Sequence, residues 1–190
     1  GCGTILKPGV VMFGELLPAA TFARAESLIR DTGVLLVVGS SLMFRFEDHQ
    51  EQIRRLARMF KAAVPVAESY GIRMAVENHI DFTGAEILQL LESVDSPYLG
   101  LNFDTGNSYL AGQDPIKWLK RVRDRLVHVH AKDISVQHSA AERGKVTGTP
   151  AGCACGDGVI DWARVVQILE AASFDGVLSV ECGTPEQAAR

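Results

Sequence analysis

Three carboxylates and one imidazole stand near the carboxyl ends of four predicted strands. They are Glu77 in "RMAVENH", Asp104 in "LGLNFD", His130 in "LVHVHAK" and Glu181 in "VLSVEC". An oxygen-rich ligand set with one imidazole suits Mn²⁺, Mg²⁺ or Co²⁺ and also accepts Zn²⁺. Because no short motif joins the four residues, the predicted divalent-metal site rests on their matching positions in the strands. For any one of them taken singly, a solvated residue at a strand end is the alternative interpretation.

The strand pattern indicates which way these side chains face. Side chains alternate between the two faces of a strand, so His128, His130 and Lys132 share one face of "LVHVHAK". A flat parallel sheet covered by helices on both faces has nearly continuous apolar strands. An apolar outer face and a polar inner face are instead typical of a (β/α) barrel, whose chemistry lies at the carboxyl ends of its strands. The later strands show this alternation in the pairs Met74/Val76 against Glu77/His79, Leu101/Phe103 against Asn102/Asp104, Val127/Val129 against His128/His130, and Leu178/Val180 against Ser179/Glu181.

Apolar periodicity predicts an α/β fold with about six parallel strands. The first two strands are continuously apolar, so the architecture is expected to change near residues 40–45. Continuously apolar strands favour a flat, doubly covered sheet before about residue 43, and alternating strands favour a (β/α) barrel wall after it, within one domain of 190 residues. The family resemblances given below imply, more specifically, a Rossmann-like βαβ segment at 1–43 joined to a half TIM barrel at 44–190. The sheet is expected to be open or an incomplete barrel. The predicted strands are 10–15, 34–41, 73–79, 99–104, 126–132 and 177–182, and the predicted helices are 18–33, 47–70, 84–93, 114–124 and 160–172.

Composition limits the partners and the location that we expect. The formal net charge is -4 and the sequence pI is about 5.7, with no basic stripe for a nucleic acid. No apolar run approaches the roughly 20 residues of a membrane span, and no secretion signal is recognised, which favours a cytoplasmic protein. Four cysteines in a chain of this length do not predict a disulfide framework, and Cys153-Ala-Cys155 favours a plain loop over a zinc site.

Two further features add candidates for binding a substrate. Lys132 and Asp133 directly follow His130 and are expected to contact substrate oxygens, although an ordinary ion pair explains them equally well. The segment 134–158 is predicted to be a long loop on the same side of the sheet, and loops of this length often serve as lids.

From about Phe44 onward the chain resembles the sugar isomerase/epimerase superfamily of xylose-isomerase-like TIM barrels. The matching stretches are "AVENH", "LNFDTGN", "VHVHAKD", "GDGVIDW" and "LSVEC", and they correspond to strands five to eight of that barrel. The resemblance implies that Glu77, Asp104, His130 and Glu181 are metal ligands, and that Glu77 and Glu181 are the catalytic acid/base pair. It also implies that Asn107 contacts the substrate, and we include His79 among the residues expected to do so.

Residues 1–42 resemble something else. "LKPGVVMFGELLP" and "VLLVVGSSL" look like the carboxyl-terminal Rossmann portion of a sirtuin deacylase. The glycine-rich phosphate loop, the catalytic histidine segment and most zinc cysteines of that family are missing, so deacylase activity is not expected. We interpret the chain as an engineered fold chimera, with a natural fusion as the alternative.

Four functions follow as hypotheses. The first is a chimera without turnover that carries a remnant isomerase site, in which the divalent metal need not be retained. The second is an active sugar or polyol isomerase or epimerase, in which two carboxylates transfer a proton through an enediolate. A phosphodiesterase of the related apurinic endonuclease type and NAD binding at Gly39-Ser40-Ser41 rank third and fourth.

Two structural risks accompany these hypotheses. Open sheet edges are expected to favour a homo-oligomer. In a flat sheet, strands about 4.8 Å apart would spread four ligands over about 14 Å, which is too wide for one ion.

Overall fold

The structure is a computed structural model that describes residues 34–37, 48–136 and 151–181. The chain divides into two compact units, Gly1–Gly33 and Val34–Arg190, and every described element belongs to the second. The strand predicted at 10–15, the helix predicted at 18–33 and the Gly39-Ser40-Ser41 stretch lie outside the described residues. The predicted single domain and the boundary near residue 43 therefore stay predictions.

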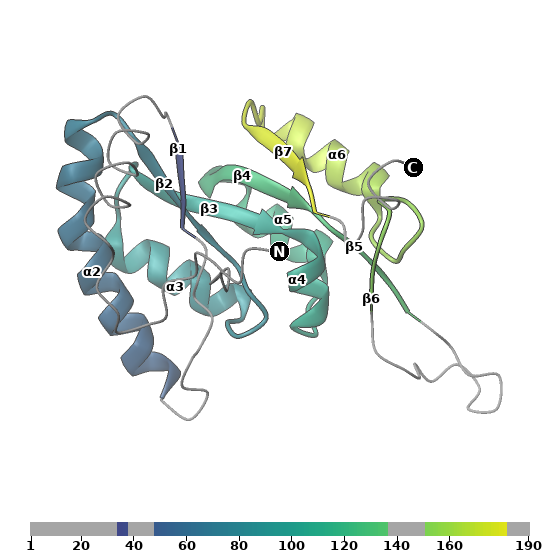
Figure 1. The fold of residues 1–190 in the computed structure, drawn as a ribbon, viewed down its shortest axis with the longest axis horizontal. Helices are drawn as coiled ribbons and strands as arrows, with labels where there is room; N and C mark the ends of the chain where they lie inside the picture. Colours follow the sequence, from purple (N-terminus) through teal and green to yellow (C-terminus); the bar gives the residue numbers. More distant parts are fainter. Residues whose placement is uncertain (1–33, 38–47, 137–150, 182–190) are drawn as a thin grey trace, which may run out of the picture. The chain divides into compact units, whose positions relative to one another are not determined.

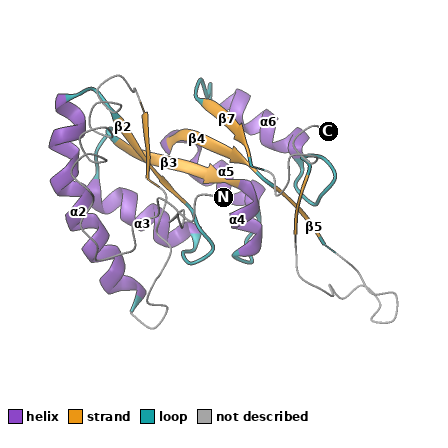
Figure 2. Cartoon of the chain, viewed as in Figure 1, coloured by secondary structure: helices purple, strands orange, loops and turns teal. Residues whose placement is uncertain are grey.

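Five parallel strands form one sheet in the order β1-β2-β3-β4-β7 (Figure 1). Helices separate the successive strands of this sheet along the chain, as Figure 2 shows. The prediction of an α/β fold with parallel strands is confirmed, whereas the sixth strand and the Rossmann-like join are not. The strands are β1 (Val34–Val37), β2 (Arg73–Glu77), β3 (Leu99–Asp104), β4 (Leu126–Ala131) and β7 (Val177–Val180).

Local capping signals set the bounds of the helices. The Asp48 carboxylate accepts a hydrogen bond from the Glu51 N–H and begins α2, and Gly71 follows its end with a φ of 66°. Thr83 and Glu86 form a reciprocal capping box at the start of α3. No described helix has the length and apolar character needed to cross a bilayer. The helices are α2 (His49–Ser69), α3 (Gly84–Val94), α4 (Thr105–Leu110), α5 (Pro115–Val122), the 3-10 turn η1 (Arg123–Arg125) and α6 (Trp162–Ala171).

The two faces of the sheet differ as the alternation predicted in β2, β3 and β4, whereas Leu178 and Val180 of β7 are exposed. One face supplies Met74, Val76, Leu101, Phe103 and Val129 to a buried core, which also contains side chains of α2, α3, α5 and α6. The other parity carries the polar residues of the central strands. The helices thus cover an apolar face, and the polar face remains to build a site.

Two features differ from the sequence-based expectation. Helix α4 begins immediately after β3, because Asp104 both ends the strand and caps the helix through the Asn107 N–H. The predicted loop at 134–158 is not irregular throughout, because β5 (Asp133–Ser135) pairs antiparallel with β6 (Ala151–Cys153). An antiparallel ribbon therefore forms its base, and residues 137–150 lie outside the described part.

Asp133 ties this ribbon to the segment before α6. Its side chain has no exposed surface, and its two oxygens accept hydrogen bonds from five N–H groups. Four donors are backbone groups, those of Ile134, Gly156, Gly158 and Ile160, and the fifth is the Trp162 indole. A side chain at position 158 would collide with this carboxylate, since a Cβ there would lie 2.1 Å from Asp133 Oδ1. Asp133 is thus a structural anchor for the segment 156–162.

Replacing Asp133 with Asn should lower the free energy of unfolding by about 3 kcal/mol at pH 7, because an amide offers one acceptor oxygen and sets an NH₂ against N–H donors. Burial alone would raise the pKa of Asp133, but the hydrogen bonds from Trp162 and the backbone outweigh it and lower that pKa. A carboxyl with a lowered folded pKa stabilises the fold above its unfolded pKa and loses this effect as the pH falls through the folded value.

The difference in stability between the parent and Asp133→Asn should therefore shrink below pH about 4. Urea unfolding at pH 7 and at pH 3 measures it, with the exposed Asp175→Asn as the matched control. Equal stability of the parent and Asp133→Asn at pH 7 would contradict the anchoring role.

Candidate metal centre

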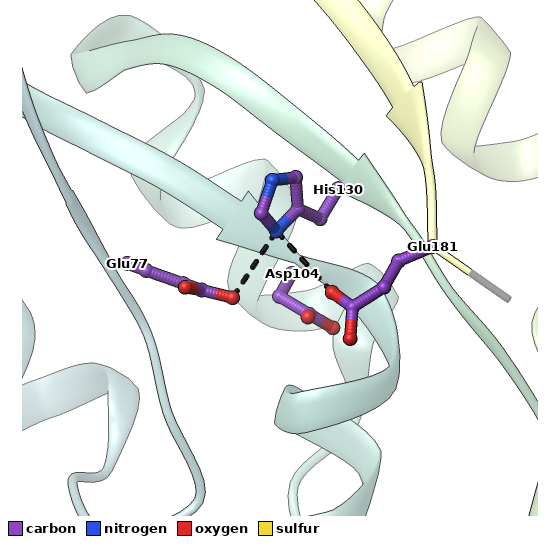
Figure 3. Close-up of side chains that lie close together, drawn as sticks. All are labelled: Glu77, Asp104, His130 and Glu181. Carbon is purple, nitrogen blue, oxygen red and sulfur yellow. Dashed lines mark hydrogen bonds and ion pairs between the residues drawn. The ribbon is translucent and has the colours of Figure 1, made fainter. Parts of the chain in front are cut away.

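Four predicted ligands converge at the carboxyl ends of β2, β3, β4 and β7. Glu77, Asp104, His130 and Glu181 each offer one ligand atom, and these atoms all lie within 4.8 Å of one another. Figure 3 shows the four side chains directed at one another, with His130 joined to Glu77 and to Glu181. A flat sheet would spread them over about 14 Å. The strand ends are therefore arranged as in a curved barrel wall.

Stagger between the strands contributes to this convergence. Glu77 lies beside Asn102 in register, whereas Asp104 lies beside His130. His130 in turn lies beside Ser179, two residues before Glu181. Such stepwise displacement is the shear that accompanies barrel curvature.

The imidazole of His130 lies between two carboxylates. Its Nδ1 is 3.1 Å from Glu77 Oε1 and 3.4 Å from Glu181 Oε2. The amide nitrogen of Asn102 is 3.2 Å from Nδ1 and 3.3 Å from Nε2 of the same ring. The His128 ring meets the His130 ring edge-on, with 5.3 Å between the ring centroids. The orientation of His130 is thus fixed from several sides.

Asp104 is the most deeply buried of the four ligands and has no exposed surface. Its Oδ1 accepts a hydrogen bond of 2.8 Å from the Asn107 N–H, and Asn78 pairs its side-chain amide with the Asp104 backbone at 2.8 and 2.9 Å. Burial raises the pKa of Asp104 to about 8, with a further contribution from the charges of Glu181 and Glu77, against the effect of the Asn107 hydrogen bond and the Lys132 charge. A proton on Asp104 therefore relieves the crowding of carboxylates at neutral pH.

Lys132 places an ammonium group beside the cluster. Its Nζ lies 2.6 Å from Glu181 Oε1, 3.4 Å from Asn107 Oδ1 and 3.8 Å from Asp104 Oδ2. Burial would raise the pKa of Glu181, but the hydrogen bond and charge of Lys132 outweigh it and lower that pKa. The lysine stem needs a glycine at position 106, where a Cβ would lie 2.6 Å from Lys132 Cγ.

The other predicted substrate contacts divide into two groups. Asn107 and Lys132 lie at the cluster, where Asn107 Nδ2 is 3.4 Å from Glu77 Oε1. His79 pairs instead with Asp81 at 3.1 Å. The oxygens of Asp133 accept hydrogen bonds from the segment 156–162, which gives Asp133 a structural role, and its predicted substrate contact stays a prediction.

Sequence reasoning assigned no role to three residues that support the centre. Asn102 shares the inner parity with Asp104, so the alternation that identified the ligands could also have identified Asn102. Asn78 and Thr105 carried no such signal, because Asn78 has the opposite parity to Glu77 and Thr105 follows the strand. The Thr105 hydroxyl donates to Lys132 O at 2.7 Å and fixes the backbone beside the ammonium group.

The side chains present fit a divalent cation. Among the described residues, Asp104 Oδ2 is buried and has no hydrogen-bond partner, although Asp104 belongs to the ligand cluster. Three carboxylates and one imidazole supply the hard oxygen and nitrogen donors that Mg²⁺, Mn²⁺ and Zn²⁺ accept. Glu77, Asp104, His130 and Glu181 would hold the ion.

Comparison with known proteins identifies relatives that are similar in sequence. The chain is 29% identical to an inosose dehydratase of Lacticaseibacillus casei over 140 residues, which are 69% of this chain and 47% of the relative. It is 27% identical to a 3-oxo-isoapionate decarboxylase of Pectobacterium atrosepticum over 127 residues, which are 67% of this chain and 45% of that relative. The chain thus spans about half the length of the curated relatives it matches.

Two solved structures show the same fold and contain metals. The IOLI protein with a zinc atom matches 90% of this chain and 62% of its own at a TM-score of 0.67 and 20% identity. A xylose isomerase-like TIM barrel protein from Mycobacterium smegmatis in complex with magnesium matches 88% of this chain and 62% of its own, at a TM-score of 0.65 and 15% identity.

These comparisons do not support the predicted join to a sirtuin fragment. The model of the family described as "Xylose isomerase-like TIM barrel" matches residues 20–190, which include much of the segment that resembles a sirtuin. The continuous match across residue 43 means that the chain belongs to the xylose isomerase-like TIM barrel family.

Proposed function

We propose that this chain carries the divalent-metal centre of an enzyme that removes a proton beside the carbonyl of a small sugar or polyol ketone. The observation that carries the proposal is the convergence of four ligand atoms within 4.8 Å of one another, with Lys132 next to them. The curated relatives named above act in sugar chemistry by their names, which supports the substrate class. The engineered chimera gained no support, so the proposal does not include it.

The two glutamates have environments that suit different tasks. A bound metal would polarise the substrate carbonyl and the neighbouring hydroxyl, and so acidify the carbon between them. The Glu181 side chain is 41% exposed, whereas that of Glu77 is 6% exposed. The pKa of Glu181 is lowered, which keeps its carboxylate ionised. Glu181 is therefore the group that removes the proton. The removed proton would stay on Glu181, and Glu77, which contacts His130 and Asn107, would be the group that carries and delivers a second proton to the carbon.

Lys132 and Asn107 would bind the substrate oxygens. The ammonium group already lies between Glu181 and Asn107 Oδ1, so it can donate a hydrogen bond to an oxygen that becomes negative as the proton leaves. Return of a proton to carbon gives isomerisation or epimerisation. Loss of a hydroxyl from the next carbon gives dehydration, and the relative called inosose dehydratase favours this second outcome.

Mn²⁺ should bind to chelator-stripped protein. Loss of a residue that only supports a metal ligand typically weakens metal binding by roughly 10–100-fold, so Glu181→Gln, which removes a ligand itself, should weaken it by more than this. Isothermal titration measures the affinity. The matched control is Glu92→Gln, an exposed carboxylate on α3, which should leave it unchanged. Absence of binding by the folded parent, or equal affinity in Glu181→Gln, would refute the metal centre.

Proton abstraction should be detectable without knowing the final product. In D₂O, the metal-loaded protein should exchange deuterium into the carbon beside the carbonyl of an inosose or a ketohexose. Glu181→Gln should slow this exchange by about 10²–10⁴-fold, because it removes the general base. Proton NMR follows the exchange, and an unchanged rate in the variant would exclude Glu181 as the base.

Metal affinity should rise with pH up to about 8. The raised pKa of Asp104 means that the metal-free centre holds a proton below that pH, and the metal must displace it. Release of one proton predicts an increase in affinity of about tenfold per pH unit below the pKa and a plateau above it. Titration in buffers of different ionisation enthalpy measures the released proton, and a flat affinity between pH 6 and 9 would contradict this assignment.

A further inference from the structure

Backbone pairing between β2 and β3 stops just below the ligand cluster. Strand β2 ends at Glu77, which lies beside Asn102 in register, whereas β3 continues to Asp104. One further backbone bond follows β2, from the Asn78 N–H to Asn102 O at 3.4 Å. In a regular parallel ladder, the chain after Glu77 would also pair with the backbone of Asp104. Because Asp104 is fully buried, its backbone N–H and C=O need partners from elsewhere.

The side chain of Asn78 supplies both partners. Its Oδ1 accepts a hydrogen bond from the Asp104 N–H at 2.8 Å, and its Nδ2 donates one to Asp104 O at 2.9 Å. Asn78 is itself buried, and an unpaired polar group in such a place costs about 1–3 kcal/mol. The amide of Asn78 therefore continues the pairing of β2 with β3 where the backbone of β2 has ended.

The remaining hydrogen of the Asn78 amide is directed at helix α4. Nδ2 also donates to Ser108 Oγ at 3.2 Å. A primary amide has two N–H donors and one acceptor oxygen, so both donors and the oxygen of Asn78 are engaged. The same helix carries Asn107, whose Nδ2 lies 3.4 Å from Glu77 Oε1. One buried side chain thus joins β2, β3 and α4.

This link can act on the ligands without touching their ligand atoms. Glu77 directly precedes Asn78 in the chain, and Asp104 is the residue whose backbone the Asn78 amide binds. Figure 3 shows that these two ligands come from neighbouring strands and meet at the cluster. Metal sites work only when their ligands are held within about 0.5 Å of the required geometry. The position of Asp104 relative to Glu77 is therefore a quantity that the fold must control.

We propose that Asn78 is a positioning residue of the metal centre, whose amide holds the carboxyl end of β3 against β2 and so sets the separation between Glu77 and Asp104. The inference rests on the proposed function, because it concerns the same centre. Without the amide, the last backbone bond between the two strands among the described residues lies below the cluster, at Asn102. The ends that carry the ligands can then move apart.

Two variants of the full chain test this role. Asn78→Ala removes both bonds to the Asp104 backbone, and Asn78→Ser keeps a short polar group that cannot reach both. Each should weaken Mn²⁺ binding to chelator-stripped protein by about 10–100-fold, the usual effect of losing a group that supports a ligand. Isothermal titration well below the melting temperature measures this affinity. The visible spectrum of the Co²⁺ form, which reports the arrangement of the ligands, should shift in both variants.

The matched control removes the third hydrogen bond of the same amide. Ser108→Ala deletes the contact with α4 but leaves both bonds between Asn78 and the Asp104 backbone. It should lower the melting temperature, because Ser108 is buried, and should retain the Mn²⁺ affinity and the Co²⁺ spectrum of the parent. A merely structural role of Asn78 predicts that the Asn78 variants behave in the same way as this control.

The outcomes distinguish this inference from the proposed function. If the parent binds Mn²⁺ and the folded Asn78 variants match its affinity and Co²⁺ spectrum, the role of Asn78 is overturned and the metal centre stands. Equal losses in Ser108→Ala and Asn78→Ala would also overturn it, because the effect would then be a general loosening. Failure of both Asn78 variants to fold would do so too, since Asn78 would then support the whole fold rather than the ligand spacing. Failure of the folded parent to bind Mn²⁺ would overturn the metal centre and this inference with it.

Discussion

The constraint on which the rest of the site depends is electrostatic crowding. Three carboxylates have ligand atoms within 4.8 Å of one another and of an imidazole. Two like charges about 4 Å apart repel by about 4 kcal/mol near a protein surface, and by more in the interior. The metal-free protein reduces this cost by the proton that burial keeps on Asp104, whose pKa is raised to about 8, and by the ammonium group of Lys132 beside Glu181. A divalent cation would replace the proton on Asp104, and its positive charge would make the ammonium group of Lys132 unnecessary for balancing the carboxylates.

The backbone creates the crowding through irregular strand pairing. Leu101 pairs with Leu126, but Asn102 pairs with His128, so Val127 is an extra residue in β4. Because partners in register face the same way, this irregularity sets both imidazoles of β4 on the face that carries Asn102 and Asp104. Irregularities of this kind often re-aim side chains beside functional sites. Beyond the strand, the Thr105 hydroxyl binds the backbone of Lys132, and Gly106 leaves room for the lysine stem. Together they place Lys132 beside the same cluster.

Much of the site was predictable because alternation along a strand is a local property. The parity of polar residues, together with their place near the strand ends, singled out Glu77, Asp104, His130 and Glu181 as candidate ligands. Their separation was not predictable, because it depends on stagger and curvature that no single strand encodes. Asp133 shows the same limit. Its neighbour Lys132 reaches the cluster, but the side chain of Asp133 has the opposite parity and faces away from it. Its partners come from 156–162, which are distant in sequence. Helix α4 was missed because Asp104 serves as both ligand candidate and helix cap. The family match spans residues 20–190 and gives the predicted join to a sirtuin fragment no support, while the boundary near residue 43 stays a prediction.

Asp104 links the chemistry of the centre to the stability of the fold. A carboxyl whose folded pKa is raised binds its proton more tightly in the folded state, so its contribution to stability is lost as the pH rises from the unfolded pKa of about 4 toward the folded value. In the metal-free protein, neutral pH therefore falls within the range in which this buried residue loses its stabilising effect. A metal ion that binds only the folded chain would compensate for this loss, because it removes the proton and supplies positive charge at the same atom. The close packing of carboxylates lowers the stability of the metal-free protein, and the same packing would make the cluster selective for a strongly charged cation.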